Sequence, residues 1–236
     1  HIGHVYSLVC SYEFAKKNNG KFILRIEDID FTRCKNLFIE QIIDDINWLK
    51  IPFKRTNNQS LRKKQYSKAL DNLKDKDLVY ACWLTRKEAS STLNAPHNHI
   101  SQNASLRVND QELKNRKSLG LTPAWRLNIK NCLKYINSQK EKIYWEDIKQ
   151  GKNLLNLDQF GDVIIARKDI LTSYHLSVTV DDNSDGVTHI IRGNDLESYT
   201  NIHRLLQVLL NLRETKWFHH KLVKDTNGKR IAKRSN

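Results

Sequence analysis

Residues 1–30 read HIGHVYSLVCSYEFAKKNNGKFILRIEDID, and their pattern indicates the fold class. Apolar side chains recur at helical spacing over residues 5–15, and the following Asn18-Asn19-Gly20 tolerates the left-handed backbone at which many helices stop. Residues 21–26 alternate and are rich in Phe and Ile, which predicts a strand, and the acidic run 27–30 closes it. A helix therefore leads directly into a strand.

Helices and strands keep alternating beyond this stretch. Thr32 is expected to cap a helix with an apolar face over residues 38–49, and Ser60 to cap another over residues 66–73. The apolar run LVYACWL at residues 78–84 predicts a buried strand. Alternation of this kind is typical of a mostly parallel α/β sheet.

The pattern changes in the second half of the chain. Residues 90–122 are polar with few apolar repeats, which predicts an inserted subdomain or surface loops. Residues 199–212 return to a helical pattern. Between these two regions the period is two, and it predicts strands at residues 125–129, 143–145, 162–166, 177–180 and 187–191.

The composition limits the class of protein. The 236 residues include 39% hydrophobic side chains, which is too many for a disordered chain, and no apolar run is long enough to span a bilayer. Four scattered cysteines and the lack of a signal-peptide pattern favour a reducing, cytoplasmic setting. With 40 Lys+Arg against 26 Asp+Glu, the net charge is 40 − 26 = +14, which favours RNA or DNA as a partner.

Two short motifs lie at opposite ends of the chain. His1-Ile2-Gly3-His4 puts two imidazoles three residues apart beside the free N–H groups of a helix start, an arrangement that suits a phosphate. Near the other end, the turn Asn227-Gly228 precedes KRIAKRS at residues 229–235, a basic loop that could bring a Lys to phosphates. Taken alone, the first motif could be two exposed histidines, and the second could be a solvated basic tail.

Together the motifs resemble the paired HIGH and KMSKS signatures of class I aminoacyl-tRNA synthetases. LRIEDID at residues 24–30 is similar to a segment of glutamyl-tRNA synthetases and of their short paralogue, the glutamyl-queuosine tRNA(Asp) synthetases. Further matches follow in the same order: SYHL at 173–176, VDD at 180–182 and GVTHIIRGNDL at 186–196. The resemblance implies an α/β, Rossmann-like class I catalytic domain with a connective insertion.

The same resemblance implies a division of the chain. Residues 1–81 would be the first half of the catalytic domain, residues 82–130 the connective insertion with the remnant of a zinc-binding region, and residues 131–236 the second half, ending in the KMSKS-like loop. No anticodon-binding domain is expected among these residues. Because the chain begins at His1 rather than Met, we expect an upstream segment carrying the family's RFAPSPTG motif.

Several details resemble the short paralogue more than the full synthetases: Asp195-Leu196, residues 199–206 and residues 219–223. The implied activity is ATP-dependent activation of glutamate to glutamyl-adenylate, followed by transfer of glutamate to the queuosine base of tRNA(Asp). Two alternatives stay open. The chain could be the catalytic fragment of a glutamyl-tRNA synthetase that charges tRNA(Glu), or a non-catalytic remnant that binds tRNA.

The resemblance also assigns roles to residues. Glu27 would receive the ammonium group of glutamate, while Tyr174 and Arg192 would bind its carboxylates. The residues implied around the ATP phosphates are His1, Gly3, His4, Arg230 and Lys233. Of these, His1, His4 and Lys233 would act in catalysis. Without the resemblance, Glu27 would as often be a salt-bridge partner, Tyr174 a half-buried strand residue and Arg192 a surface cation.

The chain departs from the family pattern in two places. Ala232 stands where the signature loop has Ser, so one hydroxyl donor is lost. The zinc site is reduced to Cys82, with Leu84 in place of the second thiol, and His97 and His99 would have to substitute for missing ligands. We therefore expect no zinc. The expected partners are L-glutamate, ATP with its Mg²⁺, and tRNA(Asp), with a monomeric chain and no membrane association.

Overall fold

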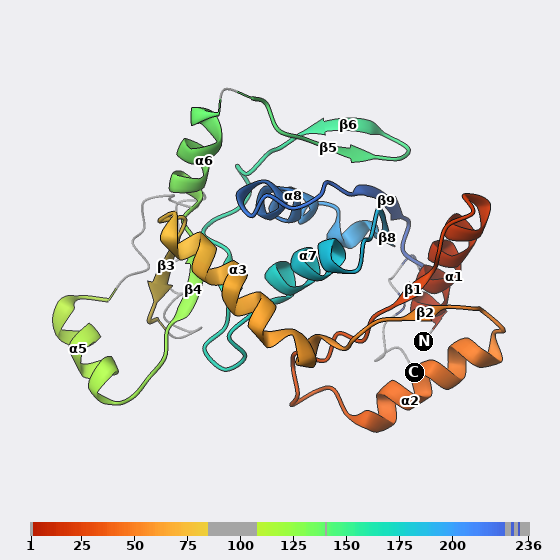
Figure 1. Ribbon diagram of the computed structural model, residues 1–236, viewed down its shortest axis with the longest axis horizontal. Helices are drawn as coiled ribbons and strands as arrows, with labels where there is room; N and C mark the ends of the chain where they lie inside the picture. The colour runs from red at the N-terminus through yellow and green to blue at the C-terminus, as the bar shows by residue number, and fades with distance from the viewer. Residues whose placement is uncertain (1, 85–107, 140, 225–227, 229–230, 232–236) are drawn as a thin grey trace.

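Three sheets form the strand framework of the described residues, 2–84, 108–139, 141–224, 228 and 231, in the computed structural model (Figure 1). One is a parallel pair of β1 (Ile23–Leu24) and β2 (Lys54–Arg55). The second is antiparallel, with the order β3 (Val79–Cys82), β4 (Ala124–Leu127) and β7 (Ile164–Ala166). The third has the order β6 (Gly151–Leu154), β5 (Tyr144–Asp147), β9 (Lys216–His220) and β8 (His189–Gly193).

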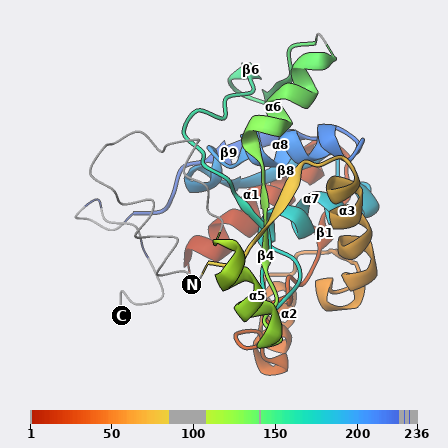
Figure 2. The ribbon, with the colours of Figure 1, turned by 90° about the vertical axis from the view of Figure 1, so that its left-hand side faces the viewer.

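The helices cover these sheets from several sides. Their bounds are α1 (Ile2–Lys17), α2 (Asn36–Trp48), η1 (Gln59–Arg62), α3 (Lys63–Asp75), α5 (Asp110–Ser118), α6 (Ile129–Ser138), α7 (Tyr174–Ser184), η2 (Asn194–Leu196) and α8 (Thr200–Leu209). Helices α3 and α7 pack side by side, as do α7 and α8 (Figures 1 and 2). In Figure 1, α1 and α2 lie at one end of the molecule and α5 at the other, with α7 and α8 between them.

The hydrophobic core lies where α3, α7 and α8 meet the antiparallel sheet. Its buried side chains come from residues 66–209, and the fully buried ones include Leu73, Leu127, Ile165, Leu176 and Leu206. The apolar face predicted for residues 199–212 is confirmed, because Ile202, Leu205, Leu206 and Leu209 of α8 are all buried. Burial of this apolar area, at about 25 cal/mol per Å², holds the helices on the sheet.

The opening helix and strand are confirmed. Helix α1 begins at Ile2, and the chain leaves it through Asn19, whose φ of 50° lies in the left-handed region. The Gly20 N–H donates to the Ala15 carbonyl at 2.7 Å, which satisfies a carbonyl of the last helical turn. The strand that follows, β1, is shorter than residues 21–26 predicted.

Two expectations about strands are wrong. The run at 78–84 does contain β3, but β3 pairs antiparallel with β4, so the sheet there is not parallel. Residues 177–180 form part of α7 rather than a strand. Every residue from Leu176 to Asp182 is buried, so the helix shows no amphipathic period, and its alternating valines imitate a strand.

The two predicted N-caps are also wrong. Thr32 donates to the Asp30 carboxylate at 2.6 Å, and α2 begins later, after Lys35, with no side-chain cap. Ser60 lies within η1, where its N–H and hydroxyl both donate to Asp28, at 2.8 and 2.7 Å. Both side chains hold carboxylates of the acidic run 27–30, which follows β1, instead of starting a helix.

The polar region 90–122 lies partly outside the described residues. Its described part contains α5, which Asn109 caps by accepting from the Glu112 N–H and in which no residue is buried. The chain leaves the antiparallel sheet at the end of β3 and returns to it through β4, the neighbouring strand. The insertion boundaries at 82 and 130 stay a prediction.

None of the described helices combines the length and the apolar character needed to cross a lipid bilayer.

Candidate active site

The first of the predicted glutamate-binding residues, Glu27, follows the end of β1. Its carboxylate lies 3.5 Å from the Arg25 guanidinium, and its side chain is 40% exposed. Arg25 itself is held by Asp182 of α7, at 2.7 Å, and by Asp185, the residue that follows α7, at 3.0 Å. These ion pairs fix the end of β1 against α7, so Glu27 presents an accessible carboxylate from a rigid position.

Tyr174 is the first residue of α7. The Ser173 hydroxyl caps this helix by accepting from the Leu176 N–H, at 3.5 Å, which sets the position of its first turn. The Tyr174 hydroxyl interacts with the Arg192 guanidinium. Burial raises the pKa of Tyr174, so the phenol is protonated at neutral pH and can donate a hydrogen bond.

Arg192 lies in β8 and is only 7% exposed. Its guanidinium donates to Thr200 Oγ1 at 2.7 Å, His203 Nδ1 at 2.9 Å and the Leu196 carbonyl at 3.2 Å. A longer contact of 3.4 Å reaches His219 Nε2. All four partners are uncharged acceptors.

No carboxylate of the described residues forms an ion pair with Arg192, whereas Arg25 and Arg62 each have at least two. Burial lowers the pKa of Arg192, because a cation removed from water loses solvation. A carboxylate ligand would restore that loss through a charge-assisted contact. Arg192 is thus a buried cation suited to binding an anion.

The three residues converge in one place. Glu27 and Arg192 both act on the pKa of Tyr174, Glu27 raising it and Arg192 lowering it. Asp182 of α7, buried beside them, acts electrostatically on all three residues. The structure therefore joins an accessible carboxylate, a phenol and a guanidinium that has no ion-pair partner in the described part of the chain, at the ends of β1 and β8. Such a site fits a small molecule that carries both an ammonium and a carboxylate group.

Helix α1 brings the HIGH-like motif to the same edge. From its N-terminal side onward, Ser7 contacts His220 at the end of β9, Ser11 contacts the Ile191 carbonyl, and Phe14 packs on His189 at the start of β8. Helix and strand thus run in opposite directions, so the N-terminus of α1 lies at the carboxyl ends of β8 and β9. Ligands of parallel sheets bind at this edge, and a helix N-terminus favours phosphate there.

Of the predicted phosphate-binding residues, two are described. Gly3 and His4 lie in the first turn of α1, with Gly3 half-buried and His4 exposed. His1, Arg230 and Lys233 fall outside the part of the chain that the structure describes. The Ile231 N–H, within the basic motif, donates to the Val223 carbonyl at 3.2 Å. Ile231 therefore lies beside Val223, which follows the end of β9.

Sequence reasoning missed the polar side chains behind Arg192. His175, Thr200, His203, His219 and Asp147 come from four elements, and only the fold assembles them. The available signal was weak. His175 directly follows Tyr174, and His219 stands in the strand next to Arg192, but a lone histidine in an apolar pattern predicts no particular partner.

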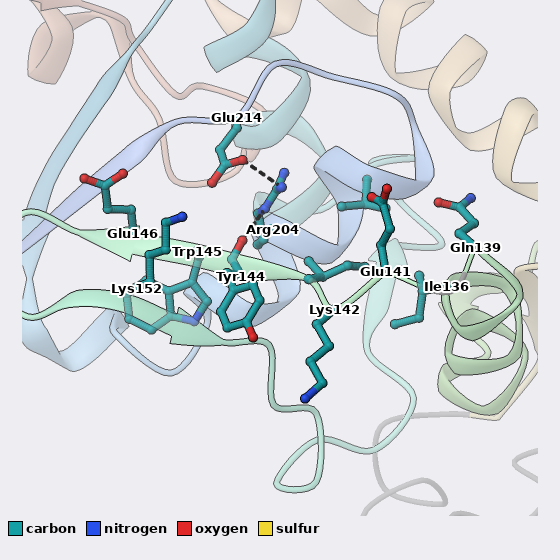
Figure 3. Close-up of a pocket in the computed structure, with 12 residues that line it drawn as sticks. Ile136, Gln139, Glu141, Lys142, Tyr144, Trp145, Glu146, Lys152, Arg204 and Glu214 are labelled. Carbon is teal, nitrogen blue, oxygen red and sulfur yellow. Dashed lines mark hydrogen bonds and ion pairs between the residues drawn. The ribbon is translucent and has the colours of Figure 1, made fainter.

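A separate groove of about 450 Å³ lies between the end of α6, the β5–β6 hairpin and α8 (Figure 3). Arg204 and Glu214 form an ion pair of 2.8 Å on its wall. None of the predicted site residues lines it. Trp145 lines the groove on one side and packs edge-on against His219 on the other, at 5.9 Å between ring centroids. The groove is therefore distinct from the candidate site.

The expected lack of zinc stays a prediction. The described residues contain no group of three or more His, Cys, Asp or Glu side chains placed to hold a metal ion. Cys82 is buried in β3. His97 and His99 lie outside the described ranges.

Comparisons with known proteins agree with this geometry. Residues 1–236 match the family described as tRNA synthetases class I (E and Q), catalytic domain. A Glutamyl-Q tRNA(Asp) synthetase of Rhodobacter capsulatus is 35% identical over all of this chain and 87% of its own length. Glutamate–tRNA ligase 2 of Brucella melitensis is 32% identical, and this chain spans 52% of its length.

Two solved structures share the fold. The glutamate tRNA ligase of Elizabethkingia meningosepticum, crystallised with its amino acid, superposes with a TM-score of 0.78 at 24% identity. The Glutamate-tRNA Synthetase of Elizabethkingia anophelis gives 0.79 at the same identity. The match covers 99% of this chain and about half of each of those, 49% and 50%. With its α/β architecture and its full-length match, the chain belongs to the family of class I glutamyl- and glutaminyl-tRNA synthetase catalytic domains.

Proposed function

We propose that this protein activates glutamate with ATP and transfers the glutamyl group to the queuosine base of tRNA(Asp). Glu27 binds the ammonium group of glutamate, and Tyr174 and Arg192 bind its carboxylates. The ATP site is at the N-terminus of α1, with His1, Gly3 and His4 at the phosphates, and with Arg230 and Lys233 supplied by the basic loop. Catalysis of the first step falls to His1, His4 and Lys233.

One observation carries the proposal. Arg192 is a buried guanidinium without an ion-pair partner among the described residues, and it lies beside Tyr174, on whose pKa the accessible carboxylate of Glu27 also acts. An amino acid with a second carboxylate matches this distribution of charge. Leaving such a cation permanently unpaired inside a protein costs several kcal/mol, so a binding role accounts for its retention.

The first step needs positioning more than base catalysis. An oxygen of the glutamate α-carboxylate attacks the α-phosphorus of ATP, a phosphorus–oxygen bond to the β-phosphate breaks, and pyrophosphate leaves. The nucleophile is already ionised, so the protein contributes alignment and charge stabilisation. Mg²⁺ enters with ATP and neutralises phosphate charge. The backbone N–H groups of the first turn of α1 and the imidazole of His4 meet the remaining charge.

In the second step the queuosine base attacks the glutamyl carbonyl and AMP leaves. The net charge of +14 favours the approach of RNA. The short paralogue is favoured because Asp195-Leu196, residues 199–206 and residues 219–223 resemble it more than they resemble the full synthetases. The proposed division of the chain is unchanged: catalytic halves at 1–81 and 131–236 around an insertion at 82–130. We place the protein in the cytoplasm as a monomer.

A second activity has support from one observation. The identity to glutamate–tRNA ligases, 32%, is close to the 35% shared with the Glutamyl-Q tRNA(Asp) synthetase. In that case the glutamyl group would pass to the 3′ end of tRNA(Glu). The resemblance implies that full synthetases activate glutamate only with tRNA bound, whereas the short paralogue activates it alone.

Glutamate-dependent ATP–pyrophosphate exchange separates the two. We expect exchange without any RNA, and transfer of labelled glutamate to tRNA(Asp) carrying queuosine but not to the same tRNA lacking that base. Exchange that requires tRNA(Glu) would instead assign the protein to the ligases. No exchange under any condition, from folded protein, would leave a non-catalytic RNA-binding role.

A further inference from the structure

Three histidines lie behind Arg192, and we call His175, His203 and His219 the histidine cluster. His203 of α8 connects Arg192 to His175 of α7: its Nδ1 is 2.9 Å from Arg192 Nη1, and its Nε2 is 3.0 Å from His175 Nδ1. His219 of β9 lies on the other side, with Nε2 3.0 Å from Thr200 Oγ1 and Nδ1 3.0 Å from the Asp147 carboxylate. His203 is 3% exposed.

The partners determine which nitrogen of each ring carries its proton. A guanidinium only donates hydrogen bonds, so His203 Nδ1 must accept from Arg192 and its proton must be on Nε2. That Nε2–H donates to His175 Nδ1, which places the proton of His175 on its own Nε2. On the other side, Asp147 accepts from His219 Nδ1–H, so His219 Nε2 is free to accept.

These tautomers give the cluster a direction. His203 and His219 are the two imidazoles next to Arg192. Each points a nitrogen lone pair toward the guanidinium and donates its N–H to a group on the far side of the ring. The cluster therefore holds the plane of the guanidinium without neutralising its charge. A carboxylate in the same place would hold it equally well but would consume the charge that an anionic ligand needs.

We propose that His203, oriented by His175, is a positioning residue that holds Arg192 ready for a substrate carboxylate. This inference rests on the proposed function, because the carboxylate is that of glutamate. Neutrality of the imidazoles is essential to it, and burial together with the charge of Arg192 lowers the pKa of both His175 and His203. Both rings are thus uncharged at neutral pH.

A matched set of variants tests the role of His203. His203→Asn keeps an acceptor close to the place of Nδ1, whereas His203→Leu removes it and leaves a charged donor without that partner. Gln207→Leu, one turn along α8, is the control, because Gln207 is also buried but bonds to Thr215 and not to the cluster. The two leucine variants both remove a buried polar group from the same helix.

In ATP–pyrophosphate exchange, we expect His203→Leu to raise the glutamate KM about 10-fold or more, with a smaller change in kcat and no change in the KM for ATP. His203→Asn should recover most of the glutamate KM, and Gln207→Leu should leave it near that of the unmodified protein. A glutamate KM unchanged in a folded, active His203→Leu variant would overturn the inference and leave the proposed function intact.

The tautomers are measurable on the unmodified protein, without any activity. Long-range ¹H–¹⁵N spectra of histidine-labelled protein at pH 7.5 should show His175 and His203 as neutral Nε2–H tautomers and His219 as the Nδ1–H tautomer. An Nδ1–H tautomer or a charged ring at His203 would overturn the inference whatever the enzyme does. Absence of glutamate-dependent exchange together with the expected tautomers would reject the proposed function but support the hold on Arg192.

Discussion

Arg192 is the residue on which glutamate binding is expected to depend most. Its guanidinium is buried and has only neutral partners among the described residues, so a bound carboxylate would be its counter-ion. Removing one member of such a buried charge pair costs about 2–5 kcal/mol, or roughly 30-fold and upward in affinity. We expect Arg192→Ala to raise the glutamate KM by at least that factor in ATP–pyrophosphate exchange.

The control for this variant is Arg204→Ala. This variant also removes a guanidinium, but Arg204 lines the separate groove and pairs with Glu214. Its glutamate KM should stay within about threefold of the unmodified protein, a margin below 1 kcal/mol. An Arg192→Ala variant with an ordinary glutamate KM would show that the resemblance assigns this residue wrongly.

His175 links a single residue to the stability of the protein. Burial, followed by the charge of Arg192, lowers the pKa of His175 from 6.5 to about 4. Between these values the unfolded chain binds a proton there and the folded chain does not, so stability rises with pH in this window. This contribution to the free energy of unfolding is lost as pH falls from about 6.5 to about 4, by up to about 1.4 kcal/mol per pH unit for one such group.

Comparing the unmodified protein with the His175→Asn variant isolates this contribution. Asparagine keeps an acceptor for His203 but has no proton to gain, so the free energy of unfolding should fall less steeply on acidification. Urea denaturation at several pH values between 4 and 7 measures the difference. Identical slopes for the two proteins would mean that the pKa of His175 is not depressed.

At the scale of elements, Asp181 ties α7 to α3 and η1. Its carboxylate is fully buried and accepts from Tyr66 at 2.8 Å, Gln59 at 2.8 Å and Arg62 at 3.2 Å. Removing one partner of a buried ion pair destabilises a protein by about 3–5 kcal/mol, because the remaining charge is left uncompensated. We expect Asp181→Ala to lower the free energy of unfolding by this amount in urea denaturation.

Asp71→Ala is its counterpart on the surface. Asp71 pairs with Lys74 one turn along α3, at 2.8 Å, with 56% of its side chain exposed. Exposed pairs contribute about 0–1 kcal/mol, so this variant should be close to the unmodified protein in stability. Equal effects of the two substitutions would indicate that Asp181 does not connect the elements energetically.

The molecule as a whole is strongly basic, and only some of its Lys and Arg side chains are expected to act in catalysis. If Lys233 reaches the phosphates mainly as charge accumulates during transfer, Lys233→Ala should lower the rate of adenylate formation by roughly 100-fold or more. Affinity for tRNA should change little, because the other 39 Lys and Arg residues (40 − 1) keep the long-range attraction.

Two measurements on the same Lys233→Ala protein decide this. Single-turnover adenylate formation reports the chemical step, and tRNA binding at two salt concentrations reports the general attraction. An unchanged chemical step with a small, salt-dependent loss of tRNA affinity would describe a basic tail that only holds RNA. Lys233 would then leave the proposed catalytic set.

Three features could be predicted from the sequence: the family, the opening helix with its left-handed stop, and the apolar face of α8. These features depend on neighbours along the chain, whose spacing and backbone preferences are visible in the letters. Motif order also named Glu27, Tyr174 and Arg192, and the structure brings these three together.

The other features depend on contacts between segments that are far apart in the sequence. Residues 177–180 alternate like a strand, but neighbours on all sides bury them as a helix, so their periodicity carried no information about the fold. Thr32 and Ser60 resemble helix caps, but each hydroxyl donates to a carboxylate of the acidic run 27–30, and neither caps a helix. The histidine cluster joins residues 175, 203 and 219, and hydrogen bonds between distant segments leave no pattern in the sequence. Its effect on Arg192 exists only once α7, α8 and β9 have packed together.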